Sequence, residues 1–567
     1  MLAISVPCSV ALATAFLSSL PTINAFQTAI PHRQTQFVAK RNFPAPATIS
    51  IRSLLRRQET NHVALAPPLA SSSSMDVEDV IEETSSVIED DSNGDFNWFK
   101  AWHPLVPVEF LDPEKPHAFK LLGIDVVVWN DGPLDKSPLF GPRKNRVKGA
   151  KKSDGNWRVF VDQCPHRKVP LSEGRIEDDG SLLCSYHGFR FDGKGAVVDV
   201  PQLFSDSDVD KIRANSKSKC NSFPVEIVNG VLWVWPDASD DSKIQSALTE
   251  VPTLKLEGVN EENLWFGLWN FRELPYGHDF FIENVVDHAH VGVSHHNVVG
   301  NRYSSQKMSL ETIKPLSKHG FSIHIITPEI PDGAITEFNA PAQVIVKTPY
   351  GDGGAIQYVE LYSSPSRPGF SNHVGRMVVV KDSTGEMPQQ FKKFTGPLPV
   401  WLNHVITSLF LNQDALFLHA QERSLAHNKE YRASDPNVTG DNYAKSILPM
   451  PADIGVLQFR TWMRLVAGGN IPFKGDTTMP ATDKEVVFDV YNAHTKHCKN
   501  CQVALKNLKK IRFASFFFAV LMATVRPKKL GVVGSTVATI LFSGIGGMLN
   551  KLIGMFYRYE FSHADNH

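Results

Sequence analysis

The chain has 567 residues, enough for two or three domains that each bury a complete hydrophobic core. Its 58 Lys and Arg residues balance 59 Asp and Glu residues, so no excess of positive charge suggests a nucleic-acid partner. Six cysteines are too few for a disulfide scaffold in a chain of this length. Four of them form two groups and two are isolated: Cys164 with Cys184, Cys498 with Cys501, and Cys8 and Cys220 alone.

The first part of the chain, residues 1–69, has the composition of a targeting sequence. An apolar run over residues 10–20 is typical of a signal peptide and is short for a membrane span. Residues 26–69 are rich in Arg, Ser and Thr and contain one acid, Glu59, which is typical of a transit peptide. Together they resemble the bipartite plastid presequence of algae whose plastid has extra membranes; a plain secreted protein is the alternative. Residues 70–95 contain nine acids and are predicted to be a disordered linker.

Two short motifs of cysteine and histidine dominate the next segment, residues 96–237. Cys164-Pro-His166 and Cys184-Ser-Tyr-His187 are separated by seventeen residues. In a Rieske [2Fe-2S] centre one iron takes two thiolates and the other takes two imidazoles, and each of two loops supplies one ligand of each kind. Zinc is the alternative metal, but paired zinc ligands more often have two residues between them on both sides. Packed thiols beside incidental histidines are a third possibility.

Short runs of alternating or apolar residues predict an antiparallel β-barrel or sandwich around these motifs. They are bounded by Gly, Pro and Asp, and they lie at residues 119–129, 157–161, 182–184 and 231–235. An insertion after the first run, Lys136 to Lys152, contains seven basic residues. We expect either a solvated loop or a patch that speeds the encounter with an acidic electron donor.

A second cluster of possible metal ligands lies in the following segment, residues 238–490. Asp287 and His290 share a face of a helix because they are three residues apart, whereas His290 and His295 do not. The chain must therefore bend at Gly292, or the helix must end, for both histidines to reach one ion. Two histidines and one carboxylate on one iron form the facial triad of non-haem Fe(II) oxygenases. A buried histidine is more often structural than a ligand, but the preceding cluster motif favours the metal.

The rest of this segment is predicted to form a second antiparallel sheet and one long helix. Strand-like runs lie at residues 322–327, 343–347, 356–362 and 376–381. Residues 401–425 carry apolar side chains at helical spacing. A sheet and a long helix that follow an all-β domain place the chain in the α+β class.

Two further features lie near the C-terminus. Residues 491–510 contain Cys498-Lys-Asn-Cys501, which is either a redox pair or half of a metal site. Because the chain has no second Cys-x-x-Cys pair for a zinc ribbon, we expect a reversible disulfide with a regulatory role, and surface thiols are the alternative. Residues 511–556 contain uncharged runs of thirteen and twenty-one residues on either side of a basic turn. They are predicted to form a transmembrane hairpin, with a buried core as the alternative.

The cluster motifs and their flanks, Cys164-Pro-His-Arg and Cys184-Ser-Tyr-His-Gly-Phe, resemble the Rieske domain of ring-hydroxylating oxygenases. Together with the later histidines, the Cys-x-x-Cys and the hydrophobic tail, they make residues 96–556 resemble the plastid subgroup of these enzymes. That subgroup contains pheophorbide a oxygenase, the translocon-associated Rieske proteins, and oxygenases of protochlorophyllide and chlorophyllide a. The resemblance implies an all-β Rieske domain, and a helix-grip catalytic domain that encloses a large apolar pocket.

The resemblance also implies cofactors and the roles of individual residues. The [2Fe-2S] cluster would be held by the two cysteines and two histidines of the Rieske motifs. A mononuclear non-haem Fe(II) would be held by His290 and His295. Asp287 would bridge the two metal sites by hydrogen bonds to His290 and, across a subunit boundary, to His187 of the partner subunit.

The third iron ligand is implied by the family to be a carboxylate on the long helix, well over a hundred residues after the second histidine. Asp414 lies 119 residues past His295 and fits this position. Glu422, about two helical turns later, is the rival ligand. Its neighbour Arg423 offers it a salt bridge, which favours Asp414 as the ligand.

The function implied is that of an oxidoreductase that uses reduced ferredoxin and dioxygen to oxygenate a chlorophyll-derived tetrapyrrole, as pheophorbide a oxygenase does. Activity on chlorophyllide a or protochlorophyllide is one alternative, and a non-catalytic redox sensor or electron carrier at the inner-envelope translocon is the other. The implied partners are ferredoxin, the tetrapyrrole, a membrane, and two further copies of the chain in a homotrimer. Thioredoxin is expected at Cys498 and Cys501. The expected location is the inner envelope or the thylakoid of a plastid, in an alga with a complex plastid.

Overall fold

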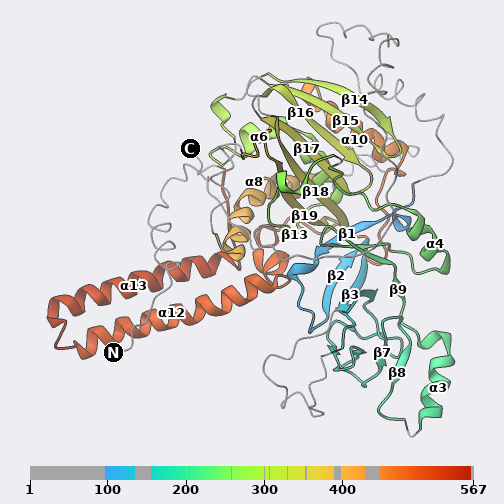
Figure 1. Ribbon diagram of the computed structural model, residues 1–567, viewed down its shortest axis with the longest axis horizontal. Coiled ribbons are helices and arrows are strands. Elements are labelled where there is room, and N and C mark those ends of the chain that lie inside the picture. The colour runs from blue at the N-terminus through green and yellow to red at the C-terminus, as the bar shows by residue number, and fades with distance from the viewer. Residues whose placement is uncertain are drawn as a thin grey trace.

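The structure is a computed structural model that describes residues 96–563, apart from the stretches 134–154, 204, 257, 299, 305–306, 328–329, 351–353, 388–397 and 428–446. The predicted presequence (1–69), linker (70–95) and basic insertion (136–152) therefore lie outside the described residues. The described chain forms a body with two β-rich parts, from which a pair of long helices projects (Figure 1).

The first β-rich part carries the two cysteine and histidine motifs on three small antiparallel sheets, with strand orders β1-β11-β10, β2-β3-β4-β9 and β5-β6-β7-β8. Its own apolar core includes Trp129, Phe160 and Phe191, all fully buried beneath the motif loops. The strands are β1 His103–Pro107, β2 His117–Leu121, β3 Ile124–Asn130, β4 Trp157–Val161, β5 Arg175–Ile176, β6 Leu182–Leu183, β7 Arg190–Phe191, β8 Val197–Asp199, β9 Ser222–Phe223, β10 Val225–Val228 and β11 Val231–Val234. Two helices flank them, α3 Asp206–Ala214 and α4 Asp240–Leu248.

The second β-rich part is one eight-stranded antiparallel sheet with the strand order β12-β19-β18-β17-β16-β15-β14, in which β13 also pairs with β19. Its strands are long enough for a broad surface, and their bounds are β12 Leu264–Phe266, β13 Asn270–Leu274, β14 Ser309–Ser317, β15 Gly320–Thr327, β16 Ile330–Asn339, β17 Gln343–Tyr350, β18 Ala355–Arg367 and β19 Phe370–Val380. The four strands predicted from residue 322 onwards are confirmed as β15, β17, β18 and β19. Each observed strand extends beyond its predicted apolar run at one or both ends.

Helices cover one side of this sheet. The helix α5 packs against β17, β18 and β19, and α10 packs against α5, β14 and β15. The long helix α8 contacts α5, β13, α11 and α12, so it ties the sheet to the C-terminal elements. Their bounds are α5 His278–Val286, α6 Ala289–Ser294, α8 Val400–His427, α10 Ile454–Leu465, α11 Lys484–Val487, α12 Lys499–Val525 and α13 Gly531–Met555. The helix predicted at residues 401–425 is confirmed as α8.

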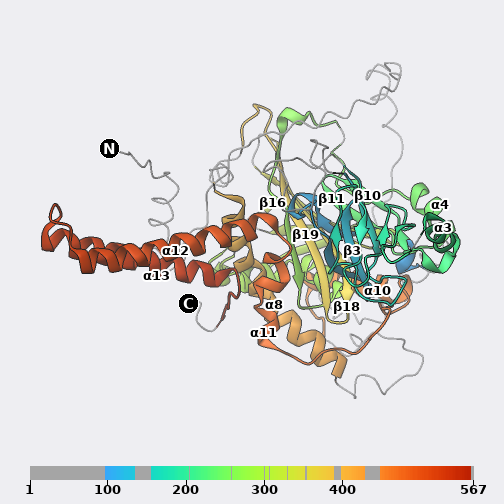
Figure 2. The same ribbon diagram turned by 90° about the horizontal axis from the view of Figure 1, so that it is seen from below.

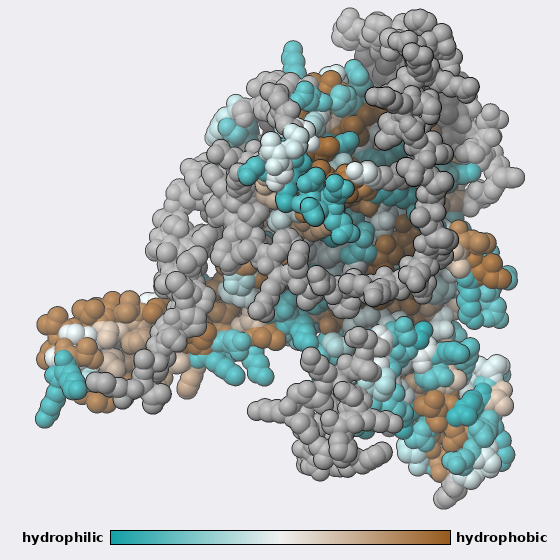
Figure 3. All heavy atoms as spheres, viewed as in Figure 1, coloured by the Kyte–Doolittle hydropathy of each residue, from teal (hydrophilic) through white to brown (hydrophobic). Residues whose placement is uncertain are grey.

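The projecting pair is an antiparallel hairpin of α12 and α13 (Figures 1 and 2). Its outer half is covered with apolar side chains (Figure 3), among them Phe513, Phe517, Val533 and Ile540, which are all more than half exposed. Within the described residues, α13 is the one helix whose length and composition suit a membrane span; its best window has a mean hydropathy of 1.7 and is 11% buried. The apolar part of α12 is shorter because its first half carries lysines.

The apolar run at residues 119–129 forms two strands, β2 and β3, joined by a tight turn at Leu122 and Gly123. Both turn residues have a positive φ, 49° and 78°. The turn donates main-chain hydrogen bonds to Pro365 O (2.8 Å) and Ser366 O (2.7 Å) at the end of β18. Lys474 N donates to Leu122 O (2.9 Å) from the other side. This turn therefore joins the first β-rich part to the large sheet.

We predict that Gly123→Ala lowers the free energy of unfolding by about 2–4 kcal/mol, because a Cβ there would lie 2.1 Å from Lys474 O at a φ that disfavours L side chains. Gly385→Ala is the matched control, since Gly385 has the same φ of 78° with nothing within 4 Å of the added Cβ. It should cost only about 1–2 kcal/mol. Thermal unfolding of both variants measures the difference, and equal losses would mean that the close approach to Lys474 relaxes freely.

Candidate metal centres

The first candidate centre lies on two loops with matching backbone geometry. Cys184 N donates to Phe189 O (2.8 Å) and Gly188 N donates to Cys184 O (3.0 Å). In the other loop, Cys164 and Lys168 make the same pair of hydrogen bonds (2.8 and 2.9 Å). The residue four positions after each cysteine has a positive φ, 61° at Lys168 and 76° at Gly188. Each loop thus turns back sharply and brings its cysteine and histidine to the same end.

The four residues of these loops differ in exposure. Cys164 and Cys184 are buried, whereas His166 is exposed and His187 is half-buried at the surface. The two imidazole rings lie 4.8 Å apart between centroids, at an angle of 64°. Burial, with the neighbouring Cys184, raises the pKa of the Cys164 thiol to about 11. A pair of buried thiolates here requires a bound cation, which is what the iron of a [2Fe-2S] cluster supplies.

The second candidate centre brings together His290, His295 and Asp414, whose ligand atoms all lie within 4.8 Å of one another. Asp414 Oδ2 is 3.1 Å from His295 Nε2 and 3.8 Å from His290 Nε2. The helix α6 ends at Ser294, and its C-cap His295 has a non-helical ψ of 28°. The expected break between the two histidines is therefore the end of the helix, and it lets residues five positions apart face one point.

The orientation of these three side chains is fixed by their other hydrogen bonds. His295 Nδ1 donates to Gln413 Oε1 (2.9 Å) and its ring stacks on Phe410 at 4.1 Å. Ser294 Oγ donates to Asp414 Oδ1, and Asn284 Nδ2 donates to Asp414 Oδ2 (3.2 Å). Burial disfavours the charged form of Asp414, but its contacts with His295, His290 and Ser294 outweigh it and lower its pKa to about 2.

The donor set at this centre fits a divalent metal ion. His290 Nδ1 faces the main-chain carbonyl of Asp287, and His295 Nδ1 faces Gln413 Oε1, so Nε2 of each ring is turned towards Asp414. Two ring nitrogens and a carboxylate thus converge on one point. This is the arrangement that a non-haem Fe(II) site uses, with second hydrogen bonds fixing each imidazole.

Asp287 lies beside this centre, at the C-cap of α5. Its bond to His290 runs through the main-chain carbonyl, while its carboxylate Oδ2 is 3.9 Å from His290 Nδ1. The other carboxylate oxygen accepts a hydrogen bond from Ala289 N (2.8 Å). The side chain of Asp287 is 29% exposed. One edge of this carboxylate therefore faces outwards from the chain.

Glu422, the rival carboxylate, lies elsewhere on α8 and takes no part in the cluster with His290 and His295. Its Oε2 accepts a hydrogen bond from Gly277 N (2.9 Å) and lies 3.3 Å from Arg423 Nη1. Burial raises the pKa of Glu422 to about 8. The expected contact with Arg423 is present as a hydrogen bond from Arg423 Nη1 to Glu422 Oε2, and Glu422 contributes to the packing between α8 and the start of α5.

A third cluster contains Cys498 and Cys501, for which the sequence left half of a metal site as one alternative. Cys498 and Cys501 are fully buried and unbonded to each other, so the alternative of surface thiols is wrong. They converge with His494 and with His404, which lies on α8. The partners of the two cysteines are histidines and not a second Cys-x-x-Cys pair, and nothing in the local sequence links His404 to residues 90 positions away.

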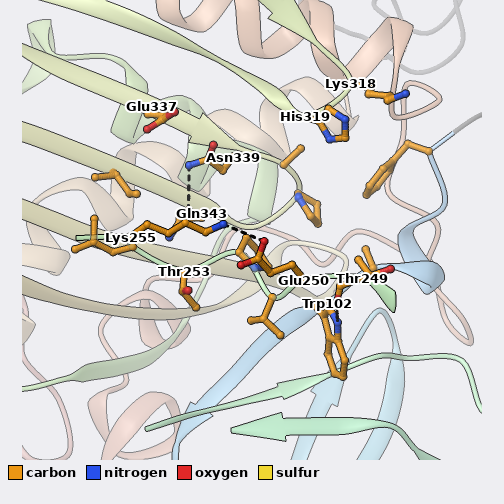
Figure 4. Close-up of a pocket in the computed structure, with 18 of the residues that line it drawn as sticks. Trp102, Thr249, Glu250, Thr253, Lys255, Lys318, His319, Glu337, Asn339 and Gln343 are labelled. Atoms are coloured by element: carbon orange, nitrogen blue, oxygen red, sulfur yellow. Dashed lines mark hydrogen bonds and ion pairs between the residues drawn. The ribbon is translucent and has the colours of Figure 1, made fainter. Parts of the chain in front are cut away.

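The large open cavity of the structure is separate from these three clusters. It has a volume of about 1200 Å³ and is lined by β16 and β17, residues 249–255, and Trp102. Figure 4 shows Asn339 bonded to Gln343 (3.0 Å) and Lys255 paired with Glu250 (2.9 Å) along its wall. Neither His290, His295 nor Asp414 lines it. The large apolar pocket expected beside the iron is therefore not this cavity, whose labelled walls are largely polar.

Comparison with known proteins gives two family matches: the Rieske [2Fe-2S] domain at residues 101–213 and pheophorbide a oxygenase at residues 338–431. Flavonoid 8-hydroxylase 2 of Ocimum basilicum is 27% identical over 504 residues, covering 84% of this chain and 88% of that protein. Pheophorbide a oxygenase of Oryza sativa subsp. japonica is 28% identical over 471 residues, covering 81% of this chain and 82% of that protein. Dicamba monooxygenase bound to dicamba is a solved structure with 16% identity and a TM-score of 0.44, over 66% of this chain and 100% of its own.

The Rieske match contains both motif loops, and the second match runs from the end of β16 to α8 and contains Asp414. Both relatives are chloroplastic proteins that align with more than four fifths of this chain. The chain therefore carries a Rieske [2Fe-2S] domain and a pheophorbide a oxygenase domain, as an oxidoreductase similar to the plastid Rieske oxygenases, with the residues for a [2Fe-2S] cluster and a mononuclear iron.

Proposed function

We propose that this protein oxygenates a chlorophyll-derived tetrapyrrole, with pheophorbide a as the favoured substrate and reduced ferredoxin as the electron donor. The observation that carries the proposal is the match of residues 338–431 to pheophorbide a oxygenase, since this stretch supplies Asp414 to the site with His290 and His295. In this proposal residues 96–237 form the Rieske domain and residues 238–490 the catalytic domain.

The proposed ligands of the [2Fe-2S] cluster are Cys164, His166, Cys184 and His187. The proposed ligands of the mononuclear iron are His290, His295 and Asp414, and the iron supplies binding and activation of dioxygen when it is bound. The protein's own residues hold this site in shape: Gln413 fixes His295, the Asp287 carbonyl fixes His290, and Ser294 fixes Asp414. The convergence of the triad argues against a non-catalytic electron carrier.

The proposed assembly is a homotrimer in which electrons pass between subunits. The loops around β7 and the helix α6 lie at opposite ends of the body (Figure 1), so the two centres of one chain are far apart. His166 and His187 are accessible at the surface, and the Asp287 carboxylate also faces outwards. These exposures support a contact between His187 of one copy and Asp287 of the next.

The proposed location is the inner envelope or the thylakoid of a plastid, in an alga with a complex plastid, with residues 511–556 inserted as a hairpin. The apolar outer half of α12 and α13 supports this insertion. Thioredoxin remains a predicted partner at Cys498 and Cys501, but both thiols are buried, so its access requires α12 to move.

Flavonoid hydroxylation is the second candidate function, because 88% of the length of flavonoid 8-hydroxylase 2 aligns with this chain. To separate the candidates, we would incubate the purified, reconstituted protein with ferredoxin and isotopically labelled dioxygen. The substrates would be pheophorbide, chlorophyllide, protochlorophyllide, a phyllobilin and a flavone. We expect the labelled oxygen in a pheophorbide product alone. Labelled oxygen in the flavone alone would mean that the protein is a flavonoid hydroxylase and that the proposal is wrong.

Asp414→Ala is expected to remove the mononuclear iron, because the two neutral histidines that remain lack a carboxylate to balance the metal charge. Iron should fall from about three to about two atoms per chain, and activity should fall with it. The absorption spectrum of the Rieske cluster should be unchanged. Glu422→Ala is the matched control on the same helix, and loss of iron there with full iron in Asp414→Ala would assign the ligand to Glu422.

Asp287→Asn is expected to keep the iron content while turnover falls by about 10–100 fold, the usual effect of changing a group that orients a metal ligand. Asparagine retains the acceptor for Ala289 N, so the local fold should persist. Iron analysis and oxygen consumption with ferredoxin measure the two effects. If turnover is normal in the variant, the carboxylate plays no part in coupling the sites.

A further inference from the structure

The third cluster consists of four side chains that meet inside the protein from three separate segments. His404 comes from α8, His494 from the π-helical turn Tyr491–Thr495, and Cys498 and Cys501 from the first turn of α12. All four are buried, and their ligand atoms lie within 4.8 Å of one another. Two cysteines and two histidines that converge from outside the oxygenase site form a complete donor set for a tetrahedral metal.

The distances in this cluster match the edges of a metal-centred tetrahedron. His494 Nε2 lies 3.2 Å from His404 Nδ1 and 3.3 Å from Cys501 Sγ. His404 Nδ1 lies 3.4 Å from Cys501 Sγ and 3.6 Å from Cys498 Sγ. Bonds of about 2.0 Å to nitrogen and about 2.3 Å to sulfur give edges of about 3.3 Å between nitrogens and about 3.6 Å between nitrogen and sulfur. The two rings are nearly perpendicular, at 83°.

Hydrogen bonding alone accounts poorly for this arrangement. His494 Nδ1 donates to Phe271 O, so Nε2 is the nitrogen of this ring that faces the cluster. His404 Nδ1 faces His494 Nε2 and both sulfurs, and one proton can form a hydrogen bond to only one of these three atoms. A cation in the centre satisfies every one of these groups at once, and the Phe271 carbonyl then fixes the His494 ring, as is usual for histidine ligands of metals.

The position of the cysteines in the fold also favours thiolates. Cys498 is the N-cap of α12, a helix of 27 residues, and the positive end of the helix dipole stabilises negative charge there. Thiolate is the form in which cysteine binds a metal ion.

We propose that His404, His494, Cys498 and Cys501 bind one zinc ion in a closed, structural site. Zinc suits the set because structural zinc sites use two sulfur and two nitrogen ligands in a tetrahedron and leave no position for water or substrate. The ion would join α8, which carries Asp414 about three helical turns after His404, to the base of the α12–α13 hairpin. It would thus fix the hairpin to the helix that shapes the iron site.

This inference replaces the predicted reversible disulfide at Cys498 and Cys501, and it does not depend on the substrate or the activity of the enzyme. Metal analysis of the purified full-length protein, dialysed against EDTA, is its direct test. We expect about one zinc beside about three irons per chain. Zinc X-ray absorption should show two sulfurs at about 2.3 Å and two nitrogens at about 2.0 Å.

The variants that test the assignment are Cys498→Ser with Cys501→Ser, and separately His404→Cys. The double serine variant should lose at least nine tenths of the zinc and keep the absorption of the Rieske cluster, while His404→Cys supplies another zinc ligand and should retain the metal. His497→Gln is the control, because His497 precedes Cys498 but stacks on Phe119 outside the cluster. If the serine variant does not fold, the X-ray absorption of the unaltered protein decides.

Three results would overturn the proposal. The first is a fourth iron per chain without zinc, which would make the site an iron site. The second is zinc that EDTA removes or that survives in the double serine variant, which would be adventitious. The third is no additional metal together with a mass that shows a disulfide between Cys498 and Cys501, which would restore the redox pair.

Discussion

The burial of polar side chains along α8 is the constraint on which the described structure depends. This helix crosses between the sheet and the C-terminal hairpin with His404, Gln413, Asp414 and Arg423 all buried along it. A buried polar or charged group is costly unless it is hydrogen-bonded or paired, so each of these side chains needs a partner from another segment. The partners are Cys501, His295 and main-chain carbonyls of residues 275 and 369. These contacts hold α8 against segments that are distant from it in the sequence.

The same helix thereby relates the iron triad to the cysteine cluster. Residues 404 and 414 are separated by about 15 Å along a continuous helix, and no hinge lies between them. A displacement of the hairpin base would be transmitted to Asp414 as a rigid-body movement, because helices packed in a core do not deform gradually. The position of the α12–α13 hairpin and the geometry of the candidate iron site are therefore mechanically linked, whichever group occupies the cysteine cluster.

Features that a few neighbouring residues determine can be predicted from this sequence, whereas features that depend on tertiary contacts cannot. The loops of Cys164 and Cys184 and the break before His295 are local patterns, because the backbone conformation of a few residues determines them. The role of Asp414 as an iron ligand is implied only by the resemblance to the family, because no motif in the neighbouring sequence identifies it. His404 and the turn at Gly123 were missed because their partners lie on distant segments, and only tertiary packing brings them together. Apolar runs also do not reveal where a tight turn divides them.

The solvent-exposed Rieske loops and the apolar α12–α13 hairpin lie at different ends of the molecule. The histidines of the Rieske loops face solvent at one end of the body, whereas the hairpin leaves from the side where α8 meets α12 (Figures 1 and 2). With the outer half of the hairpin in a bilayer, the catalytic part would lie nearer the membrane and the Rieske loops would project into the aqueous phase. An electron donor to the Rieske loops would then approach from the aqueous phase, and a substrate of the iron site that partitions into lipid would approach from the side of the hairpin, because the two centres lie in different parts of the chain.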